Sequence, residues 1–495
     1  MTKGLRVFIA ILWLTGLGGA VGVRAQSNAR PNFILLIADD MAWDDTTVNG
    51  HQTIRTPNLE RMARQGLRFE HAFVTASSCS PSRASLFTGR YPHQTGAEQL
   101  HWPVPKEQIG LTEPLRRAGY WTAAAGKWHL GEAAKPKFDV VREGNPAGFI
   151  LPVDPAVYAK LTTAEKSGCD QWVPLLRERP KDKPFFLWLA AFDPHRDYFE
   201  GTIPQPHRPE DVVIPPYLPD TPELRKEMAL YYDEITRLDQ YVGAVLDELE
   251  RQGIADNTFV LFLSDNGRPF PRAKTTVYDS GIHTPLLVRW PAKVKAGTTT
   301  KRLVSTVDIA PTILSLAGLK PGANFAGKDF SPLLTQPNKQ VREYVYAEHN
   351  WHDYDDHGRA VRSEQFKYIR NYYTDLANTP SADAVRSPSF QSLRRLRDAG
   401  QLNAAQMNCF VKPRQAEELY DVVNDPDELH NLAADPKYAA TLQKLRAELK
   451  RWEKTTHDGL PKVRTPDEFD RETGEPLPTR KPQHLPEAGQ QSQSK

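Results

Sequence analysis

The stretch FILLIADD, from Phe33 to Asp40, places six consecutive apolar residues directly before two aspartates. A continuous apolar run of this length is typical of a strand that is buried on both faces, as in a parallel sheet. Three more runs have the same character: FFLWLAA (Phe185–Ala191), FVLFLS (Phe259–Ser264) and PLLVRW (Pro285–Trp290). The sequence therefore predicts a central, mostly parallel sheet.

Helical patterns lie between these runs, and the longest falls within residues 221–253. Thr221 and Pro222 supply an N-cap and a first-turn proline, and Gly253 stands where the helix should end. Strands that alternate with helices indicate a layered α/β domain, with helices flanking the sheet. The apolar residues of the long helix step by four and three, as one face requires: Leu224, Met228, Tyr231, Ile235, Leu238, Val242, Val245 and Leu249.

The sequence pattern changes from about Lys339, where long apolar runs give way to shorter strand-like stretches. The stretches YVYAEH, FKYIRNYY and EELYDV read as strands separated by turns. A helix with one apolar face should follow, formed by Tyr438, Leu442, Leu445, Leu449 and Trp452. We expect a smaller C-terminal α+β subdomain with a short antiparallel sheet over 339–460. A polar tail over 461–495 follows, and its last stretch, PEAGQQSQSK, should be disordered.

The N-terminus has the order of a secretory signal. Lys3 and Arg6 precede an apolar run, and Val23-Arg24-Ala25 supplies the small residues for cleavage. The alternative is a membrane anchor, but the run contains several glycines and falls short of the roughly 20 apolar residues that a span needs. We expect a signal peptide over 1–25, a periplasmic or secreted protein and no membrane span after cleavage.

Charge and cysteine content limit the partners. The 63 basic and 61 acidic residues give a net charge of +2, so no global field favours nucleic acid or an anionic membrane. Three cysteines, Cys79, Cys169 and Cys409, cannot form a disulfide framework. At most one bridge forms; Cys79 is our candidate for the unpaired one, and pairing of Cys169 with Cys409 stays open.

Acidic pairs follow two of the predicted strands. Asp39 and Asp40 come after one, and Asp265 and Asn266 come after another. Ligands in such folds bind beyond the carboxyl ends of the strands. Hard oxygen donors suit Ca²⁺ or Mg²⁺. Asp-Asn-Gly is also an ordinary turn signal, so a plain turn is the alternative.

Cationic and protic side chains recur in short contexts nearby. GKWHLG offers Lys127 and His129, DPH offers His195 just past an apolar strand, and Lys274 lies between the Asp-Asn-Gly turn and the next strand. Each taken alone also suits an ordinary surface charge. A divalent cation ringed by such groups is a site for a tetrahedral oxyanion.

The stretch CSPSRASLFTGR, from Cys79 to Arg90, carries a family resemblance. It is similar to the sulfatase signature Cys-x-Pro-Ser-Arg followed by Thr-Gly-Arg, with Cys79, Pro81 and Arg83 at the matching positions. NFILLIADDMAWDD, GKWHLG, DPH, SDNG and ELYDVVNDPDELHNL resemble the family's successive blocks in order. The resemblance implies the alkaline-phosphatase-like fold, with a sulfatase catalytic domain over 26–338.

The resemblance also implies that Cys79 is not used as a thiol. In sulfatases a maturation enzyme oxidises this cysteine to formylglycine (3-oxoalanine), an aldehyde that hydrates to a gem-diol. Attack by one hydroxyl gives a sulfated hemiacetal, and deprotonation of the second hydroxyl expels sulfate and restores the aldehyde. A serine lacks that second oxygen, so the neighbouring serines read as bystanders.

Roles for individual residues follow from the same resemblance. It implies that Arg83 and Lys127 orient and acidify the gem-diol and that His129 is its general base. His195 and Lys274 would bind the sulfate oxygens, and one of them would protonate the leaving group. The ligands implied for one Ca²⁺ are Asp39, Asp40, Asp265, Asn266 and the modified residue 79. The block after Lys274 departs from the usual Tyr-Glu-Gly-Gly-x-Arg, which we interpret as substrate-pocket variation.

Several stretches look closest to the sulfamidase (heparan N-sulfatase) branch, among them AFDPHRDY, SDNGRPFPRAKTTVYDSG and LKRWEKTTHD. This implies desulfation of heparin- or heparan-derived saccharides. His349, His352 and Arg359 fall where that branch places substrate-facing residues; the alternative is an ordinary polar loop. A phosphodiesterase or phosphonate monoester hydrolase of the same fold is the second hypothesis. The third is a catalytically silent sulfoglycan-binding protein that keeps the thiol of Cys79.

Overall fold

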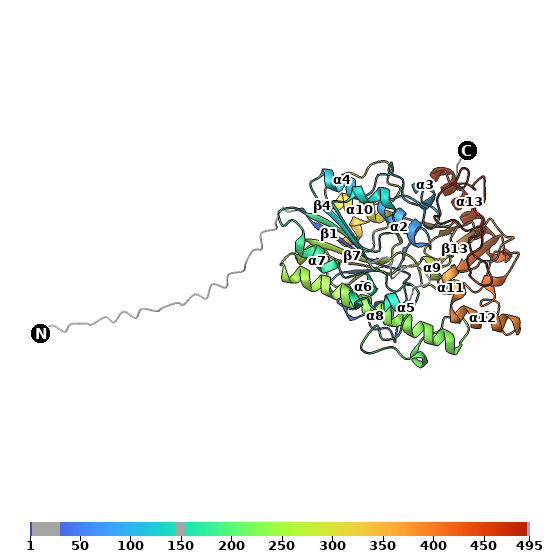
Figure 1. Ribbon diagram of the computed structural model, residues 1–495. Coiled ribbons are helices and arrows are strands. Elements are labelled where there is room, and N and C mark those ends of the chain that lie inside the picture. The colour runs from blue at the N-terminus through green and yellow to red at the C-terminus, as the bar shows by residue number, and fades with distance from the viewer. Residues whose placement is uncertain (2–29, 145–154, 493–495) are drawn as a thin grey trace.

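The computed structural model describes residues 1, 30–144 and 155–492 (Figure 1). The predicted signal peptide, apart from Met1, lies outside the described residues. Among the helices that are described, none has the length and apolarity needed to cross a membrane.

A sheet of eight strands forms the centre of the larger part. The four strands β4, β6, β1 and β7 are neighbours and run parallel. The predicted mostly parallel sheet is therefore confirmed, but the last of the four apolar runs, β8, lies antiparallel to β7. In spatial order the strands are β5 (Val140–Glu143), β4 (Trp121–Gly126), β6 (Phe185–Ala190), β1 (Asn32–Ala38), β7 (Thr258–Ser264), β8 (Leu286–Arg289), β2 (Leu67–Phe69) and β9 (Thr298–Thr300). A separate pair joins β3 (Ala72–Phe73) and β10 (Val304–Ser305).

Helices cover both faces of the sheet because side chains of β1 alternate between the faces. Phe33, Leu35 and Ile37 pack in one core with α2 (Cys79–Thr88), α4 (Thr112–Arg117) and α10 (Ile309–Leu316). Ile34 and Leu36 pack in the other core with α1 (Pro57–Arg64), α7 (Trp172–Glu178) and α8 (Pro222–Arg251). Shorter helices are α3 (Pro92–Thr95), α5 (Pro155–Tyr158), α6 (Thr163–Ser167) and α9 (Asp279–Ile282).

Helix α8 begins and ends as its sequence predicts. The Thr221 side chain accepts a hydrogen bond from the backbone N–H of Leu224, and Pro222 is the first helical residue. Gly253, two residues after the helix, has a φ of 66°, a conformation that glycine adopts without steric cost. In Figure 1 the helix runs along one side of the sheet.

A second sheet lies in the C-terminal part of the chain. It joins β11 (Val345–His349), β12 (Gly358–Arg362), β13 (Phe366–Asn371) and β14 (Glu417–Asp421), all antiparallel. Three of these strands match the predicted ones, whereas β12 was not predicted. Helix α13 (Ala439–Thr456) buries Leu442, Leu445, Leu449 and Trp452. Helices α11 (Ala382–Arg386) and α12 (Pro388–Asp398) lie between β13 and β14 in sequence.

The predicted polar tail is packed against the body over its described part, residues 461–492. Phe469 is buried, and the His484 ring stacks on Trp351 with centroids 3.8 Å apart. The expectation that the last stretch is disordered is wrong for residues 486–492, where the backbone N–H of Ser492 donates to buried Glu98. Composition does not reveal that the body offers partners to these polar groups.

Candidate active site

The carboxyl ends of four neighbouring parallel strands converge on one place. Asp39 and Asp40 follow β1, and Asp265 and Asn266 follow the adjacent β7. His195 comes after β6, on the other side of β1, and Lys127 comes directly after β4. Sheet order, rather than sequence order, therefore assembles the predicted residues.

The acidic residues form a compact cluster. One ligand atom from each of Asp39, Asp40, Asp265 and Cys79 lies within 4.8 Å of the others, and all four side chains are buried. Asn266 donates from Nδ2 to Asp40 Oδ1 at 2.7 Å, while its Oδ1 is buried without a hydrogen-bond partner. Three carboxylates beside an unused amide oxygen are a donor set that fits Ca²⁺.

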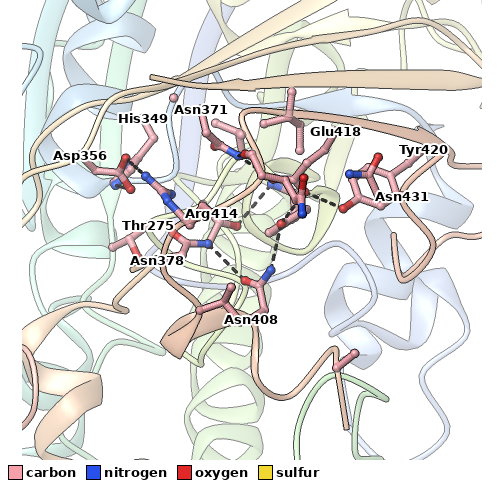
Figure 2. Close-up of a pocket in the computed structure, with 18 residues that line it drawn as sticks. Thr275, His349, Asp356, Asn371, Asn378, Asn408, Arg414, Glu418, Tyr420 and Asn431 are labelled. Atoms are coloured by element: carbon pink, nitrogen blue, oxygen red, sulfur yellow. Dashed lines mark hydrogen bonds and ion pairs between the residues drawn. The ribbon is translucent and has the colours of Figure 1, made fainter. Parts of the chain in front are cut away.

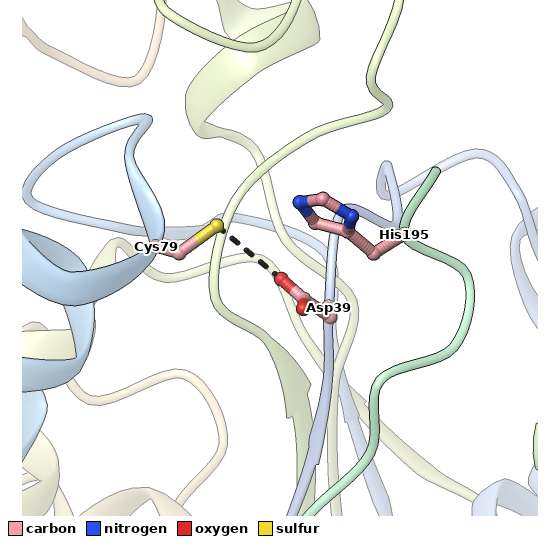
Figure 3. Close-up of side chains that lie close together, drawn as sticks. All are labelled: Asp39, Cys79 and His195. Carbon is pink, nitrogen blue, oxygen red and sulfur yellow. Dashed lines mark hydrogen bonds between the residues drawn. The ribbon is translucent and has the colours of Figure 1, made fainter. Parts of the chain in front are cut away.

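Cys79 is the first residue of helix α2, and its Sγ points at the cluster (Figure 3). The Sγ atom lies 3.4 Å from Asp39 Oδ1 and 3.7 Å from Asp40 Oδ1. Burial and the charge of Asp39 raise the pKa of the thiol well above its ordinary value. As an unmodified residue, Cys79 is thus a protonated thiol and a weak nucleophile.

Serines around Cys79 are occupied by scaffold contacts. Ser78 Oγ lies 2.7 Å from His352 Nδ1, and Ser80 Oγ accepts the backbone N–H of His101 at 2.8 Å. Ser85 Oγ donates to the carbonyl of Arg90 at 2.5 Å. These contacts give the three serines structural partners.

Three buried cations surround the cluster, each paired with one of its carboxylates. Arg83 Nε donates to Asp265 Oδ2 at 2.7 Å, and Lys274 Nζ lies 2.7 Å from Asp40 Oδ2. Lys127 Nζ pairs with Asp39. A buried charge is tolerated when it is paired in this way, so the pairs hold both partners in position.

Two carboxylates of the cluster, Asp39 and Asp265, have pKa values shifted in opposite directions. Burial acts to raise the pKa of Asp39, but Lys127 and His195 outweigh it and the pKa is lowered. Burial and the charge of Asp39 raise the pKa of Asp265 to about 7. The pKa values of His129 and His195 are both lowered, by burial first and then by Lys127 and Lys274 respectively, so both imidazoles are neutral near pH 7.

The pocket over Cys79 also holds residues that the sequence did not indicate. His101 Nδ1 lies 2.9 Å from His129 Nε2, and Asp383 Oδ2 lies 4.0 Å from His195 Nε2. No local motif marks these positions, because they reach the pocket through tertiary packing. The full lining is Cys79, Leu100, His101, His129, His195, Lys274, Trp351, His352, Asp353, Ala382, Asp383, Arg386, Glu468, Phe469 and Arg480.

Of the three predicted C-terminal substrate residues, His352 alone lines this pocket. His349 lines a different one, where its Nε2 lies 3.7 Å from Asp356 Oδ2 and Arg414 pairs with the same aspartate (Figure 2). Arg359 is fully buried, with its Nε 2.5 Å from Asp458 Oδ2. Strand β12 thus directs Arg359 into a buried ion pair, and a substrate contact of His349 or Arg359 stays a prediction.

Replacing Arg359 with glutamine should lower the free energy of unfolding by about 3–5 kcal/mol, because it leaves Asp458 buried without its partner. Denaturant unfolding measures this, and KM of the folded enzyme should not change. Arg370→Gln on neighbouring β13 is the control: that side chain is 38% exposed and 3.9 Å from Glu417, and its loss should cost under about 1 kcal/mol. A raised KM at unchanged stability would instead make Arg359 a substrate contact.

Comparison with known proteins identifies the class that this fold and site define. The model of the sulfatase family matches residues 31–319, and the model "N-sulphoglucosamine sulphohydrolase, C-terminal" matches residues 272–392. The chain belongs to the sulfatase family and is a hydrolase with the alkaline-phosphatase-like fold.

Individual sulfatases resemble the chain over most of its length. The chain is 34% identical to human N-sulphoglucosamine sulphohydrolase over 480 residues, covering 89% of this chain and 93% of that protein. It is also 34% identical to an ulvan-active sulfatase of Formosa agariphila, over 86% of this chain and 74% of that protein. The structure of BT4656 with its substrate D-glucosamine-2-N,6-O-disulfate has a TM-score of 0.65 at 20% identity, covering 86% of this chain and 98% of that one. The phosphonate monoester hydrolase of Agrobacterium radiobacter has a TM-score of 0.67 at 20% identity, covering 86% and 96%.

Proposed function

We propose that this protein is exported and removes sulfate or sulfamate groups from sulfated amino sugars such as heparin- or heparan-derived saccharides. In this proposal residue 79 is matured to formylglycine and one Ca²⁺ is bound. The observation that carries it is the position of Cys79: its Sγ lies against Asp39 and Asp40, the two carboxylates that pair with Lys127 and Lys274. The 34% identity to human N-sulphoglucosamine sulphohydrolase over nearly the whole chain supports the substrate class.

Asp39, Asp40, Asp265 and Asn266 would hold the calcium ion, together with residue 79. Bound there, Ca²⁺ supplies positive charge that stabilises the oxygens of the sulfate group. The buried Oδ1 of Asn266, which lacks a hydrogen-bond partner, supports its place among the ligands. The cations Arg83, Lys127 and Lys274 keep the neighbouring carboxylates in place.

Arg83 and Lys127 would orient and acidify the hydroxyls of the matured residue 79. Arg83 donates to the Lys127 carbonyl at 3.0 Å, so one buried network fixes both side chains. His129 would take the proton whose loss expels sulfate, because its imidazole is neutral and buried. The contact of its Nε2 with His101 Nδ1 holds that ring in orientation.

His195 and Lys274 would bind the oxygens of the sulfate group in the substrate. Both line the pocket above Cys79, and His195 Nε2 lies 3.7 Å from Asp40 Oδ2. A cation and a hydrogen-bond donor fixed before substrate arrives stabilise a charged transition state without reorganisation. One of the two would protonate the leaving amine or hydroxyl of the sugar.

Maturation is tested by peptide mass spectrometry. In a host that has the formylglycine-generating enzyme, the peptide with residue 79 should be about 18 Da lighter than the cysteine form, as expected when a thiol becomes an aldehyde. Peptides with Cys169 and Cys409, both buried free thiols, are the internal controls and should keep the cysteine mass. An unmodified residue 79 from such a host would contradict the proposal.

The substrate is tested by measuring sulfate released from glucosamines that carry a single N-, 3-O- or 6-O-sulfate and from a 2-O-sulfated saccharide. The proposal expects release from at least one. Activity on 4-nitrophenyl phosphodiesters that is well above the activity on every sulfated saccharide would favour the phosphodiesterase hypothesis. No turnover with any compound, together with an intact thiol at residue 79, would favour a silent binding protein.

A further inference from the structure

The wall of the catalytic pocket carries two arginines that the reaction at residue 79 does not use. Arg386 is the last residue of helix α11, and Arg480 belongs to the C-terminal segment 461–492. Both line the same pocket as Cys79. Arg480 lies beyond the residues that either family model matches.

One aromatic ring holds the two guanidinium groups. The Arg386 guanidinium carbon lies 5.8 Å from the centroid of Phe469, and that of Arg480 lies 4.8 Å from it. Phe469 is itself fixed in a buried cluster with Tyr354, Val385 and Phe390. Cation–π contacts therefore keep two positive charges near each other at the pocket wall.

The protein balances these charges only in part. Arg386 donates to the carbonyl of Gly474 at 2.6 Å, and no carboxylate of the described residues lies within ion-pair distance of it. Arg480 lies 3.7 Å from Glu468 Oε2, and the same carboxylate accepts a hydrogen bond from His484 at 2.8 Å. The Arg480 side chain is 47% exposed, so it is accessible to a ligand.

The other carboxylates of the pocket already have partners. Asp383 faces Lys274 and His195, which lower its pKa even though burial acts to raise it. Asp353 accepts the backbone N–H of Ala382 at 2.9 Å and lies 3.8 Å from His352 Nε2. An anion could thus contact Arg386 and Arg480 without facing an unpaired carboxylate.

We propose that Arg386 and Arg480 bind a second anionic substituent of the saccharide, separate from the group that is cleaved. This inference rests on the proposed function. The chemistry required is a pair of acceptor oxygens with negative charge, because guanidinium groups recognise sulfate and carboxylate alike. A second sulfate on the same sugar and the carboxylate of a neighbouring uronic acid are the two possible sources.

The test compares three substrates: the monosulfated glucosamine that the enzyme hydrolyses best, its disulfated counterpart, and the same sugar linked to a uronic acid. In the wild type, a second anion should raise kcat/KM about tenfold, as charge-assisted hydrogen bonds would. Whichever dianionic compound shows the gain identifies the source. Arg386→Gln and Arg480→Gln should each lower kcat/KM for it several-fold more than for the monosulfated sugar.

Arg395→Gln is the matched control. Arg395 lies on helix α12, its side chain is 61% exposed and pairs with Glu223, and it is not part of the pocket. Its substitution should leave the ratio between dianionic and monosulfated substrates unchanged. Equal losses on both substrates in the Arg386 and Arg480 variants, or no gain from a second anion in the wild type, would overturn the inference.

A binding measurement tests this inference independently of whether the proposed function is correct. Isothermal titration calorimetry on a Cys79→Ala variant, which has neither a thiol nor a hydroxyl to attack the substrate, gives a Kd for each compound without turnover. About tenfold tighter binding of a dianionic compound, lost on adding Arg386→Gln, supports the inference even if the wild type releases no sulfate. Equal affinity for all three compounds overturns it even if the wild type is an active sulfatase.

Discussion

Replacing Cys79 with serine is expected to lower turnover by on the order of 10³-fold or more, as loss of a catalytic nucleophile typically does. A serine supplies one hydroxyl, so it can accept the sulfo group but has no second hydroxyl whose deprotonation expels it. Sulfate release measures the loss, and intact-mass analysis should detect one sulfo group held on the variant. Both side chains are small, so the thermal unfolding temperature should stay close to that of the wild type.

Cys169→Ser is the control for this substitution. Cys169 is also a buried free cysteine, but it packs in the core between the sheet and helices α7 and α8. The same change of sulfur to oxygen there should leave turnover in place. A Cys79→Ser variant with near-normal activity would rule out the gem-diol mechanism.

Replacing Asp40 with asparagine should reduce turnover by about two orders of magnitude or more, as the loss of a catalytic charge typically does. The same substitution should remove the stabilisation of the folded protein by calcium. The Asp40 carboxylate lies 2.7 Å from Lys274 Nζ and accepts a hydrogen bond at 2.7 Å from Asn266, another proposed calcium ligand. Its negative charge would therefore attract the calcium ion and also pairs with the buried lysine. A ligand that binds only the folded state raises stability by mass action. Wild-type protein should therefore unfold at a lower temperature in a chelator and recover with added Ca²⁺.

Calorimetry of the Asp40→Asn variant should show little difference between chelator and Ca²⁺. Asp44→Asn is the control, because Asp44 is four residues away, 59% exposed and paired with Arg268 outside the cluster. That variant should keep the calcium response. An Asp40→Asn protein with the wild-type response to Ca²⁺ would exclude Asp40 as a ligand.

The acidic cluster and the position of Cys79 beside it were predictable because each residue is local to a recognisable element. Asp39 and Asp40 directly follow the apolar run of β1, and Asp265 directly follows β7. The two strands are parallel neighbours, so predicting the strands also predicted that their ends meet. Cys79 was recognised from contiguous residues of its motif.

The C-terminal contributions to the pocket were predicted less well. His349 and His352 are three residues apart, yet His352 reaches the pocket and His349 lines another one. Asp383, Arg386 and Arg480 stand in stretches without any motif, and Arg480 lies in a segment expected to be a polar tail. Polarity alone could not show that Phe469 would anchor this segment against helix α11.

The sequence by itself determined the four apolar strands of the central sheet, the long helix, the chemical types of the residues that follow these strands, and the family. These properties follow from the periodicity of neighbouring residues and from contiguous motifs, which folding does not rearrange. Tertiary structure alone decided that β8 runs antiparallel, that Arg359 is buried in an ion pair, and that Arg386 and Arg480 share one aromatic ring. Those outcomes depend on packing between segments far apart in the chain, for which local sequence carries no signal.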